Sequence, residues 1–277
     1  MVSANGVELC VETLGDRADP AILLIAGSNS AMDWWEDEFC DRLVAGGRFV
    51  IRYDHRDTGE SVSYPPGAPD YNGDDLADDA VGILDALGIG RAHVVGISMG
   101  GAVAQTVALD YPDRVESLTV ISTSFAVPSG LDLPGMRSDV AAAFAALERP
   151  DWSDRDAVIR YGVEVTRLYS GSGGFDEDSN RELWGRVFDR TRSIESTFLN
   201  HDLIHEREGR AHPPVSEIRA STLVFHGADD PLFPLEHGKA LAAAIPGARL
   251  ISLDGVGHEL PRRAWDLVVP AILELTS

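Results

Sequence analysis

The sequence of 277 residues has little lysine, little cysteine and no long apolar run. Lys239 is its single lysine, so chemistry through a Schiff base has one candidate, which lies in a helix-like run. Cys10 and Cys40 lack metal-type spacing, and we do not expect them to form a structural disulfide. No apolar run approaches the roughly eighteen residues of a membrane span, and the N-terminus lacks the charged and apolar regions of a signal peptide. We therefore predict a cytoplasmic protein that does not bind membranes.

Basic residues are also scarce, because 23 Lys and Arg stand against 45 Asp and Glu, a formal net charge of −22. This balance excludes nucleic acid and anionic membrane surfaces as partners, since both require basic patches. It mildly favours neutral or cationic substrates. No G-x-G-x-x-G sequence follows a predicted strand and no Walker sequence is present, so we expect no cofactor. The chain is long enough, and at 44% hydrophobic residues apolar enough, for a large buried core.

Short apolar runs and helix-like stretches alternate along the first 125 residues. Gly6–Leu14 alternates like an antiparallel edge strand, whereas continuous apolar runs predict buried strands. These runs are Ala21–Ala26, Phe49–Asp54, Ala92–Ile97 and Ser117–Ser122, followed near the C-terminus by Thr222–His226 and Arg249–Leu253. The order predicts an α/β fold with a mostly parallel, doubly wound sheet.

The alternation stops between residues 126 and 218, where no strand pattern is found. Helical stretches are predicted there over residues 140–147, 156–168, 181–188 and 194–204. We predict an α/β core domain formed by residues 1–125 and 219–277, with an all-helical cap of residues 126–218 inserted in it. The cap is expected to cover the carboxyl ends of the strands, where ligands bind in open α/β sheets.

Gly96-Ile97-Ser98-Met99-Gly100 lies between an apolar strand pattern and a helix of small residues. G-x-S-x-G in this setting is the pattern of a nucleophile elbow, a sharp turn that holds a serine hydroxyl at the edge of a sheet. Its glycines allow the tight turn, and the helix N-terminus points N–H groups toward a developing oxyanion. The pentapeptide alone is also compatible with a flexible turn and an incidental serine.

A serine nucleophile needs a base within hydrogen-bond reach, and the base needs a third group to orient it. The expected chain order in this fold is Ser, then Asp or Glu, then His. His258 follows the last predicted strand in a glycine-rich loop, and Asp230 follows the penultimate strand. Asp229 is the rival of Asp230, because only one of two adjacent side chains points inward. We predict a catalytic triad of Ser98, His258 and Asp230.

An oxyanion hole requires two N–H donors near the nucleophile. Met99 supplies one because it directly follows Ser98, and Ser28 or a neighbour in the loop after the Ala21–Ala26 strand is expected to supply the other. A plain turn is the alternative for this loop. Asn29, Trp34 and Trp35 are candidates to line the substrate pocket, with a core position as the alternative for one of the tryptophans.

His201 and His205 stand four residues apart on a predicted helix, a spacing compatible with a metal ion. No glutamate-bearing zinc motif accompanies them, so we favour a polar face of a cap helix and predict no metal site.

Four separated segments resemble the α/β-hydrolase family, and within it the aclacinomycin methylesterase branch. They are Arg52-Tyr-Asp-His-Arg-Asp-Thr-Gly-Glu-Ser61, Arg91-Ala-His-Val-Val-Gly-Ile-Ser-Met-Gly100, His237-Gly-Lys239 and Gly257-His-Glu-Leu-Pro261. The resemblance implies hydrolysis of a methyl ester on a polyketide. Many relatives carry His-Gly at the oxyanion loop, whereas this chain has Ala26-Gly27, and Ser28 stands where the resemblance suggests a second glycine.

These observations predict a serine hydrolase that cleaves a small-molecule carboxylic ester with a bulky apolar acyl part through an acyl-enzyme. A C–C bond hydrolase, a lactonase or a perhydrolase with the same triad remains an alternative. A non-catalytic small-molecule receptor on the same fold is a further one. The sequence does not predict the oligomeric state.

Overall fold

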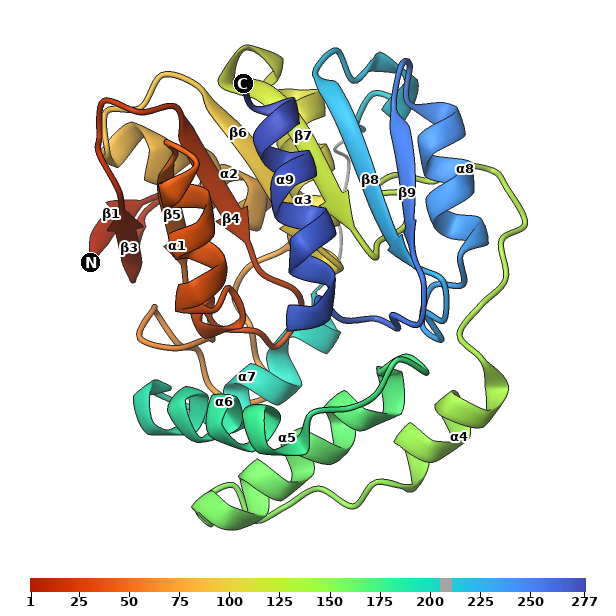
Figure 1. Cartoon of the computed structure of the whole chain (residues 1–277). Coiled ribbons are helices and arrows are strands. Elements are labelled where there is room, and N and C mark those ends of the chain that lie inside the picture. The colour runs from red at the N-terminus through yellow and green to blue at the C-terminus, as the bar shows by residue number, and fades with distance from the viewer. Residues whose placement is uncertain (205–210) are drawn as a thin grey trace.

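The computed structural model describes residues 1–204 and 211–277, and a seven-stranded sheet is its centre (Figure 1). The strand order is β3-β5-β4-β6-β7-β8-β9, in which β3 runs antiparallel to β5 and all other neighbours are parallel. The sheet strands are β3 (Val11–Leu14), β4 (Ala21–Ile25), β5 (Phe49–Tyr53), β6 (Ala92–Ile97), β7 (Val115–Ile121), β8 (Ser221–Gly227) and β9 (Arg249–Leu253). The predicted mostly parallel, doubly wound sheet is confirmed.

The N-terminal segment differs from the prediction, because one continuous edge strand over Gly6–Leu14 is wrong. β2 (Val7–Leu9) pairs instead with β1 (Val2–Ala4) in a separate two-stranded sheet, and only β3 joins the large sheet. Asn5 and Gly6, with φ of 45° and 77°, form the tight turn between β1 and β2. Cys10 interrupts the strand pattern, since its N–H donates to the Ser61 hydroxyl at 2.8 Å.

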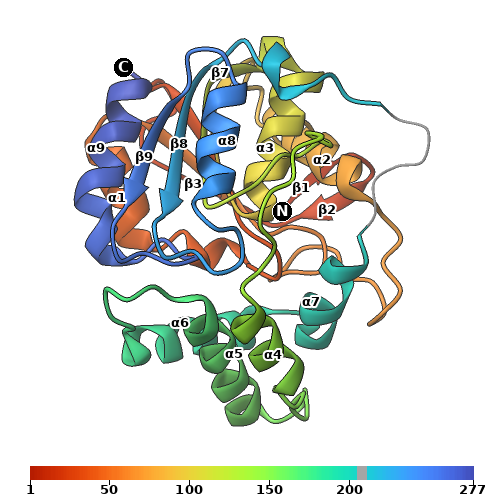
Figure 2. The same cartoon turned by 90° about the vertical axis from the view of Figure 1, so that its right-hand side faces the viewer.

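Helices cover both faces of the sheet, which explains why its central strands are continuous apolar runs. On one face lie α1 (Asp37–Ala45) and α9 (Trp265–Leu275), and on the other lie α2 (Gly73–Ala86), α3 (Met99–Asp110) and α8 (Glu236–Ala244) (Figures 1 and 2). Each layer has its own buried apolar cluster, with Phe39 and Trp265 in the first and Val103 and Leu241 in the second. No helix among the described residues has both the length and the apolar character needed to cross a membrane.

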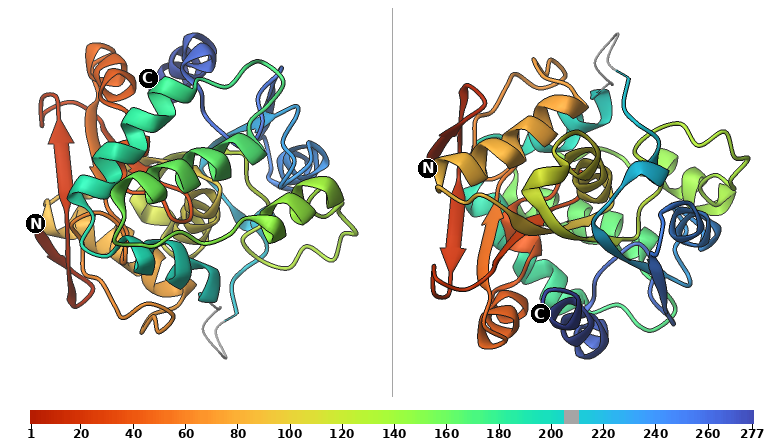
Figure 3. Two further views of the ribbon diagram at one scale, coloured as in Figure 1. Left: turned by 90° about the horizontal axis from the view of Figure 1, so that it is seen from below. Right: turned by 90° about the horizontal axis from the view of Figure 1, so that it is seen from above.

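Four helices lie across the carboxyl ends of the parallel strands (Figure 1, and Figure 3, left). They are α4 (Ser138–Ala146), α5 (Arg155–Tyr169), α6 (Glu177–Arg190) and α7 (Ile194–Asn200), and they match the predicted helical stretches to within a few residues at most ends. Short 3-10 helices complete the fold: η1 (Met32–Trp34), η2 (Pro112–Arg114), η3 (His201–Leu203), η4 (Val215–Glu217) and η5 (Arg262–Ala264). Helices α5, α6 and α7 share an apolar cluster that includes Val158, Trp184 and Phe198.

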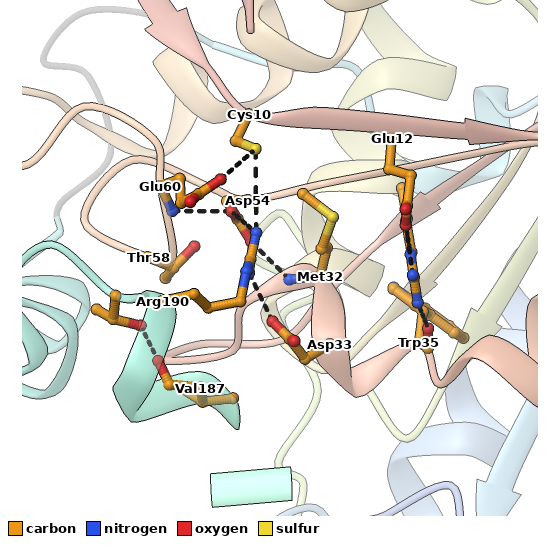
Figure 4. A network of polar contacts seen from close by, with 12 residues as sticks. Cys10, Glu12, Met32, Asp33, Trp35, Asp54, Thr58, Glu60, Val187 and Arg190 are labelled. Carbon is orange, nitrogen blue, oxygen red and sulfur yellow. Dashed lines mark hydrogen bonds and ion pairs between the residues drawn. The ribbon is translucent and has the colours of Figure 1, made fainter. Parts of the chain in front are cut away.

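An ion pair between Arg190, which is partly exposed, and the buried Asp54 links α6 to the sheet (Figure 4). Arg190, the last residue of α6, donates to both carboxylate oxygens of Asp54 at 3.0 and 2.7 Å and to Asp33 at 2.6 Å. Asp54 directly follows β5, is fully buried, and also accepts the backbone N–H groups of Met32 and Glu60. Burial raises the pKa of Asp54, and the Arg190 cation opposes that rise. Arg190 and the two N–H groups therefore stabilise the charged form of the Asp54 carboxylate.

Removal of Arg190 is expected to destabilise the fold strongly. In Arg190→Ala the buried Asp54 carboxylate loses its cation, and we expect the free energy of unfolding to fall by about 3 kcal/mol. Arg155→Ala is the matched control, because Arg155 also pairs with an α6 carboxylate, Asp189, but both side chains are about half exposed. The control should lose much less, because an exposed ion pair contributes little to stability. Urea denaturation would measure both variants. Equal losses of unfolding free energy would show that burial of the Asp54 carboxylate does not matter.

His55, which follows Asp54, is a buried neutral imidazole. Its Nε2 contacts the Ala26 carbonyl oxygen at 3.0 Å, and burial, aided by the nearby His201, lowers its pKa from 6.5 to about 3. Between these two pH values the unfolded chain binds a proton at His55 that the folded protein does not bind. The contribution of this residue to stability is therefore lost progressively as the pH falls below 6.5.

The pH dependence of stability tests this assignment. Between about pH 6.0 and about pH 4.5 the unfolding free energy of the wild type should fall more steeply than that of His55→Gln, by about 1.4 kcal/mol per pH unit. Other groups titrate in both proteins and cancel in the comparison. Parallel curves in chemical denaturation would mean that His55 is protonated equally in the folded and unfolded states.

Candidate active site

The turn that carries Ser98 is so tight that its glycines cannot be replaced without movement of the backbone. A Cβ atom on Gly96 would lie 2.1 Å from the Gly100 carbonyl oxygen, and one on Gly100 would lie 2.3 Å from the carbonyl oxygens of Ile25 and Ala26. Ser98 itself has φ of 54° and ψ of −121°, a backbone conformation that L-residues rarely adopt. The strained turn places its side chain at the end of β6 and the start of α3, as the sequence predicts.

The three predicted triad side chains lie in one hydrogen-bonded row. His258 Nε2 lies 2.8 Å from Ser98 Oγ, and His258 Nδ1 lies 2.8 Å from Asp230 Oδ2. The other oxygen of Asp230 accepts the backbone N–H groups of Leu232 and Phe233 at 2.9 Å, which fixes the carboxylate. Because a carboxylate accepts the proton of Nδ1, Nε2 presents a lone pair to the serine hydroxyl. This arrangement can remove a proton from Ser98.

Asp229, the rival of Asp230, points away from His258. Its carboxylate accepts the N–H of Ser172 at 2.9 Å and also the Ser172 hydroxyl, in the loop between α5 and α6. These hydrogen bonds lower the pKa of Asp229. Asp230 is buried and in contact with the imidazole, so the geometry favours Asp230 over its neighbour for the orienting role.

The loop after β4 forms a four-residue turn in which the N–H of Ser30 donates to the Gly27 carbonyl at 3.3 Å. The N–H of Asn29, with φ of 59°, donates to His201 Nδ1 at 2.9 Å. Within the described chain, the N–H groups of Ser28 and Met99 donate to no other residue. Since the Asn29 N–H is already used, Ser28 remains a candidate for one oxyanion donor, as Met99 does for the other.

His201 does not lie on a polar helix face, and this prediction is wrong. The residue is 5% exposed and inserted between the loop after β4 and Arg56, whose carbonyl oxygen lies 2.8 Å from His201 Nε2. Both ring nitrogens are therefore used in hydrogen bonds, which leaves neither for a metal ion. His205, its partner in the spacing argument, lies outside the described residues.

A cavity of about 980 Å³ opens between the strand ends and helices α4 to α7. Ser98, His258 and Ser28 line it together with Asn29 and aromatic side chains from both sides. Of the tryptophan pair, Trp34 meets Trp184 of α6 edge to face, with 5.5 Å between ring centroids.

Trp35 also borders the cavity but belongs mainly to the core. It is 2% exposed, packs against Phe39 and is part of the apolar cluster under α1 and α9. Of the two tryptophans, Trp34 is therefore part of the cavity wall and Trp35 is mainly a core residue, which is the alternative that the sequence left open for one of them.

The loop between α5 and α6 packs backbone to backbone against the loop that carries His258. The N–H of His258 donates to the Tyr169 carbonyl at 2.7 Å. A Cβ atom on Gly171 would lie 2.2 Å from the Gly255 carbonyl oxygen, and one on Gly257 would lie 2.1 Å from the Tyr169 carbonyl oxygen. The position of the histidine therefore depends on residues of the inserted helical segment, a role that no local sequence pattern indicates.

The segment Arg52–Ser61, which carries much of the family resemblance, is also a contact surface for α7 and η3. The Asp57 carboxylate accepts the Asn200 side-chain amide at 2.9 Å, and the Arg56 carbonyl oxygen contacts His201 as described above. With the Arg190 contact, this one segment holds the inserted helices at several places. Its sequence motif is recognisable, but nothing in the motif indicates this role.

One group of side chains in the described chain has the spacing of metal ligands, namely Asp74, Asp110 and His212. It lies outside the cavity lining. His212 Nε2 is 2.9 Å from Asp74, and His212 Nδ1 is 3.1 Å from Asp110, so the imidazole bridges the two carboxylates. Because this group lies away from the cavity, it gives no reason to assign a metal ion to the cavity.

Comparison with known proteins agrees with this architecture. The family profile for the alpha/beta hydrolase fold matches residues 20–261. The chain belongs to this family. Rhodomycin D methylesterase DauP of Streptomyces sp. (strain C5) and rhodomycin D methylesterase DnrP of Streptomyces peucetius are each 35% identical to this α/β hydrolase, over 98% of its chain and 96% of theirs. The predicted resemblance to a methylesterase branch is confirmed.

Among solved structures, the meta-cleavage product hydrolase CumD of Pseudomonas fluorescens IP01, solved as a mutant complexed with acetates, is similar with a TM-score of 0.75. It is 21% identical, and the match covers 99% of this α/β hydrolase and 96% of CumD. At that identity the similarity shows the fold alone.

Substitution of the two adjacent aspartates should distinguish their roles. Asp230→Asn removes the carboxylate that holds His258 in the required tautomer, and we expect kcat for ester hydrolysis to fall by about 10⁴-fold. Asp229→Asn is the matched control and should change kcat by less than about fivefold, because its contacts are with Ser172. Steady-state kinetics with a p-nitrophenyl ester would measure both. A larger loss in Asp229→Asn would reverse the assignment.

Proposed function

We propose that this α/β hydrolase is a serine esterase that cleaves a carboxylic ester with a bulky apolar acyl part. The observation that carries the proposal is the row Asp230, His258 and Ser98, with contacts of 2.8 Å, at a large aromatic-lined cavity. The cavity volume of about 980 Å³ is at the upper end of the range for small-molecule sites. Such a site accommodates a polycyclic acyl group.

The chemistry follows from the positions of these groups. Ser98 Oγ attacks the ester carbonyl carbon while its proton passes to His258 Nε2, and the N–H groups of Ser28 and Met99 bind the resulting oxyanion. Collapse of this intermediate breaks the bond to the alkoxy group, which takes the proton from His258 and leaves as the alcohol. A water molecule then gives its proton to His258 and attacks the acyl-enzyme. The acid is released, and Ser98 regains its proton.

The substrate proposal goes one step further, to a methyl ester of a polyketide-like acid. It is supported by the two relatives named as methylesterases of rhodomycin D, which match nearly the full length. Apolar aromatic walls formed by Trp34, Trp184 and Phe198 suit flat fused rings. In this proposal residues 126–218 form the cap that determines the acyl group, and residues 1–125 and 219–277 provide the catalytic groups. A cytoplasmic location and the absence of nucleic-acid and membrane partners stay predictions.

The proposed nucleophile can be tested by labelling and turnover together. A fluorophosphonate should add one mass equivalent to the wild type at Ser98, and Ser98→Ala should abolish labelling and lower kcat by about 10⁶-fold. Ser124→Ala is the matched control, because Ser124 Oγ also contacts a histidine, His237 Nδ1 at 2.7 Å, but lies outside the cavity lining. The control should retain labelling and turnover.

Two ester types then test the substrate class. A methyl ester of a polycyclic acid should be hydrolysed with a higher kcat/KM than a short p-nitrophenyl ester, despite its poorer leaving group. Preference for the short ester would contradict the polycyclic substrate. A protein that is neither labelled nor active but binds the polycyclic ester stoichiometrically would instead be a receptor.

A further inference from the structure

His201 connects the inserted helices directly to the proposed oxyanion loop. It lies in η3, at the end of α7, and its side chain is buried. Its Nδ1 lies 2.9 Å from the backbone nitrogen of Asn29, and its Nε2 lies 2.8 Å from the carbonyl oxygen of Arg56. The imidazole thus bridges a loop of the catalytic cavity and the segment after β5.

The two partners determine which ring nitrogen carries the proton. The Arg56 carbonyl can only accept, so Nε2 must donate, and the Asn29 N–H can only donate, so Nδ1 must be a lone pair. Burial lowers the pKa of His201, which favours this neutral ring. The imidazole is therefore an acceptor of fixed orientation for the Asn29 N–H.

This acceptor binds the N–H group of a peptide whose carbonyl oxygen, at Ser28, already accepts the Ser30 hydroxyl at 3.1 Å. The Ser30 N–H closes the turn onto Gly27, while the left-handed φ of Asn29 places its N–H toward His201. Without an acceptor this N–H would be unpaired, and rotation of the peptide between Ser28 and Asn29 would relieve that loss. Such a rotation changes ψ of Ser28 and breaks the Ser30 hydroxyl contact with the Ser28 carbonyl, so the adjacent Gly27–Ser28 peptide, which carries the Ser28 N–H, loses its support.

We propose that His201 is a positioning residue for ester hydrolysis, which holds the Gly27–Ser30 turn so that the Ser28 N–H is aimed at the oxyanion. The inference rests on the proposed function, because it needs Ser28 as an oxyanion donor. An oxyanion donor acts mainly when negative charge develops on the carbonyl oxygen. Loss of the His201 contact therefore lowers kcat and leaves KM nearly unchanged.

Two amide variants separate the two hydrogen bonds of the ring. In His201→Asn the side-chain oxygen can take the place of Nδ1 and accept the Asn29 N–H, whereas in His201→Gln the amide nitrogen can take the place of Nε2 and donate to Arg56. We expect His201→Gln to lose about 10- to 100-fold in kcat, with KM changed by less than about threefold. His201→Asn should retain kcat to within about threefold, because the contact that holds Asn29 is kept.

A transition-state analogue provides a second readout. A trifluoromethyl ketone forms an oxyanion with Ser98, so its affinity should fall in His201→Gln in proportion to kcat, while binding of the product acid stays the same. His93→Asn is the matched control, since His93 is a half-buried histidine bonded to Ser117 and absent from the cavity lining. It should leave kcat within about twofold.

The outcomes separate the two proposals. Equal kcat losses in His201→Asn and His201→Gln, or a loss confined to KM, would show a merely structural residue and overturn the inference while wild-type turnover still supports the esterase. A wild type without turnover or labelling overturns the esterase itself. If either variant is unfolded by circular dichroism, ¹⁵N NMR of the wild-type imidazole decides, because a proton on Nδ1 of His201 would contradict the proposed contact.

Discussion

The close approach of backbone to backbone at the end of β6 is the constraint on which the rest of the site depends. Because Gly96 and Gly100 leave no space for a Cβ atom, α3 can begin directly against β4 and β6, and Ser98 is held in a backbone conformation with positive φ. Such strain persists only where surrounding contacts over-determine it. The buried strands and their helix layers provide those contacts, so the fold maintains a serine that would otherwise relax into an ordinary turn.

The inserted helices complete this site rather than merely covering it. One segment, Arg52–Ser61, holds them through a buried carboxylate, a side-chain amide contact and a backbone carbonyl. From the other side, the loop after α5 holds the backbone of His258. Both His258 and the proposed oxyanion loop are thus in contact with parts of the chain that are distant in sequence from Ser98. The cavity walls and the proposed catalytic geometry are parts of one packed unit.

Local patterns explain why much of this structure could be predicted from the sequence. A signature within a few residues identifies each of three features: the apolar strand runs, the Gly96–Gly100 turn and the glycine loop around His258. The chain order expected in this fold, Ser then Asp or Glu then His, then relates the candidate residues to one another. His201 and Arg190 had no such signature, because each is a single side chain whose partners are far away in the chain. A buried histidine with two hydrogen bonds and a histidine on a polar face give the same local pattern. The break after Leu9 has no local signature either, because the Asn5–Gly6 turn is compatible with one long strand or with two short strands after it.

The contact between Gly171 and Gly257 has a consequence for how this protein can change. The two backbones touch at Gly171 and Gly257, so neither position has room for a larger side chain. A change at one of these positions would therefore require a compensating change at the other. A chimera that receives the helical segment of another protein would keep His258 in place only if that segment carried its own small residue at this junction. Diversity in the acyl group can therefore arise within the helices, while their attachment points stay the same.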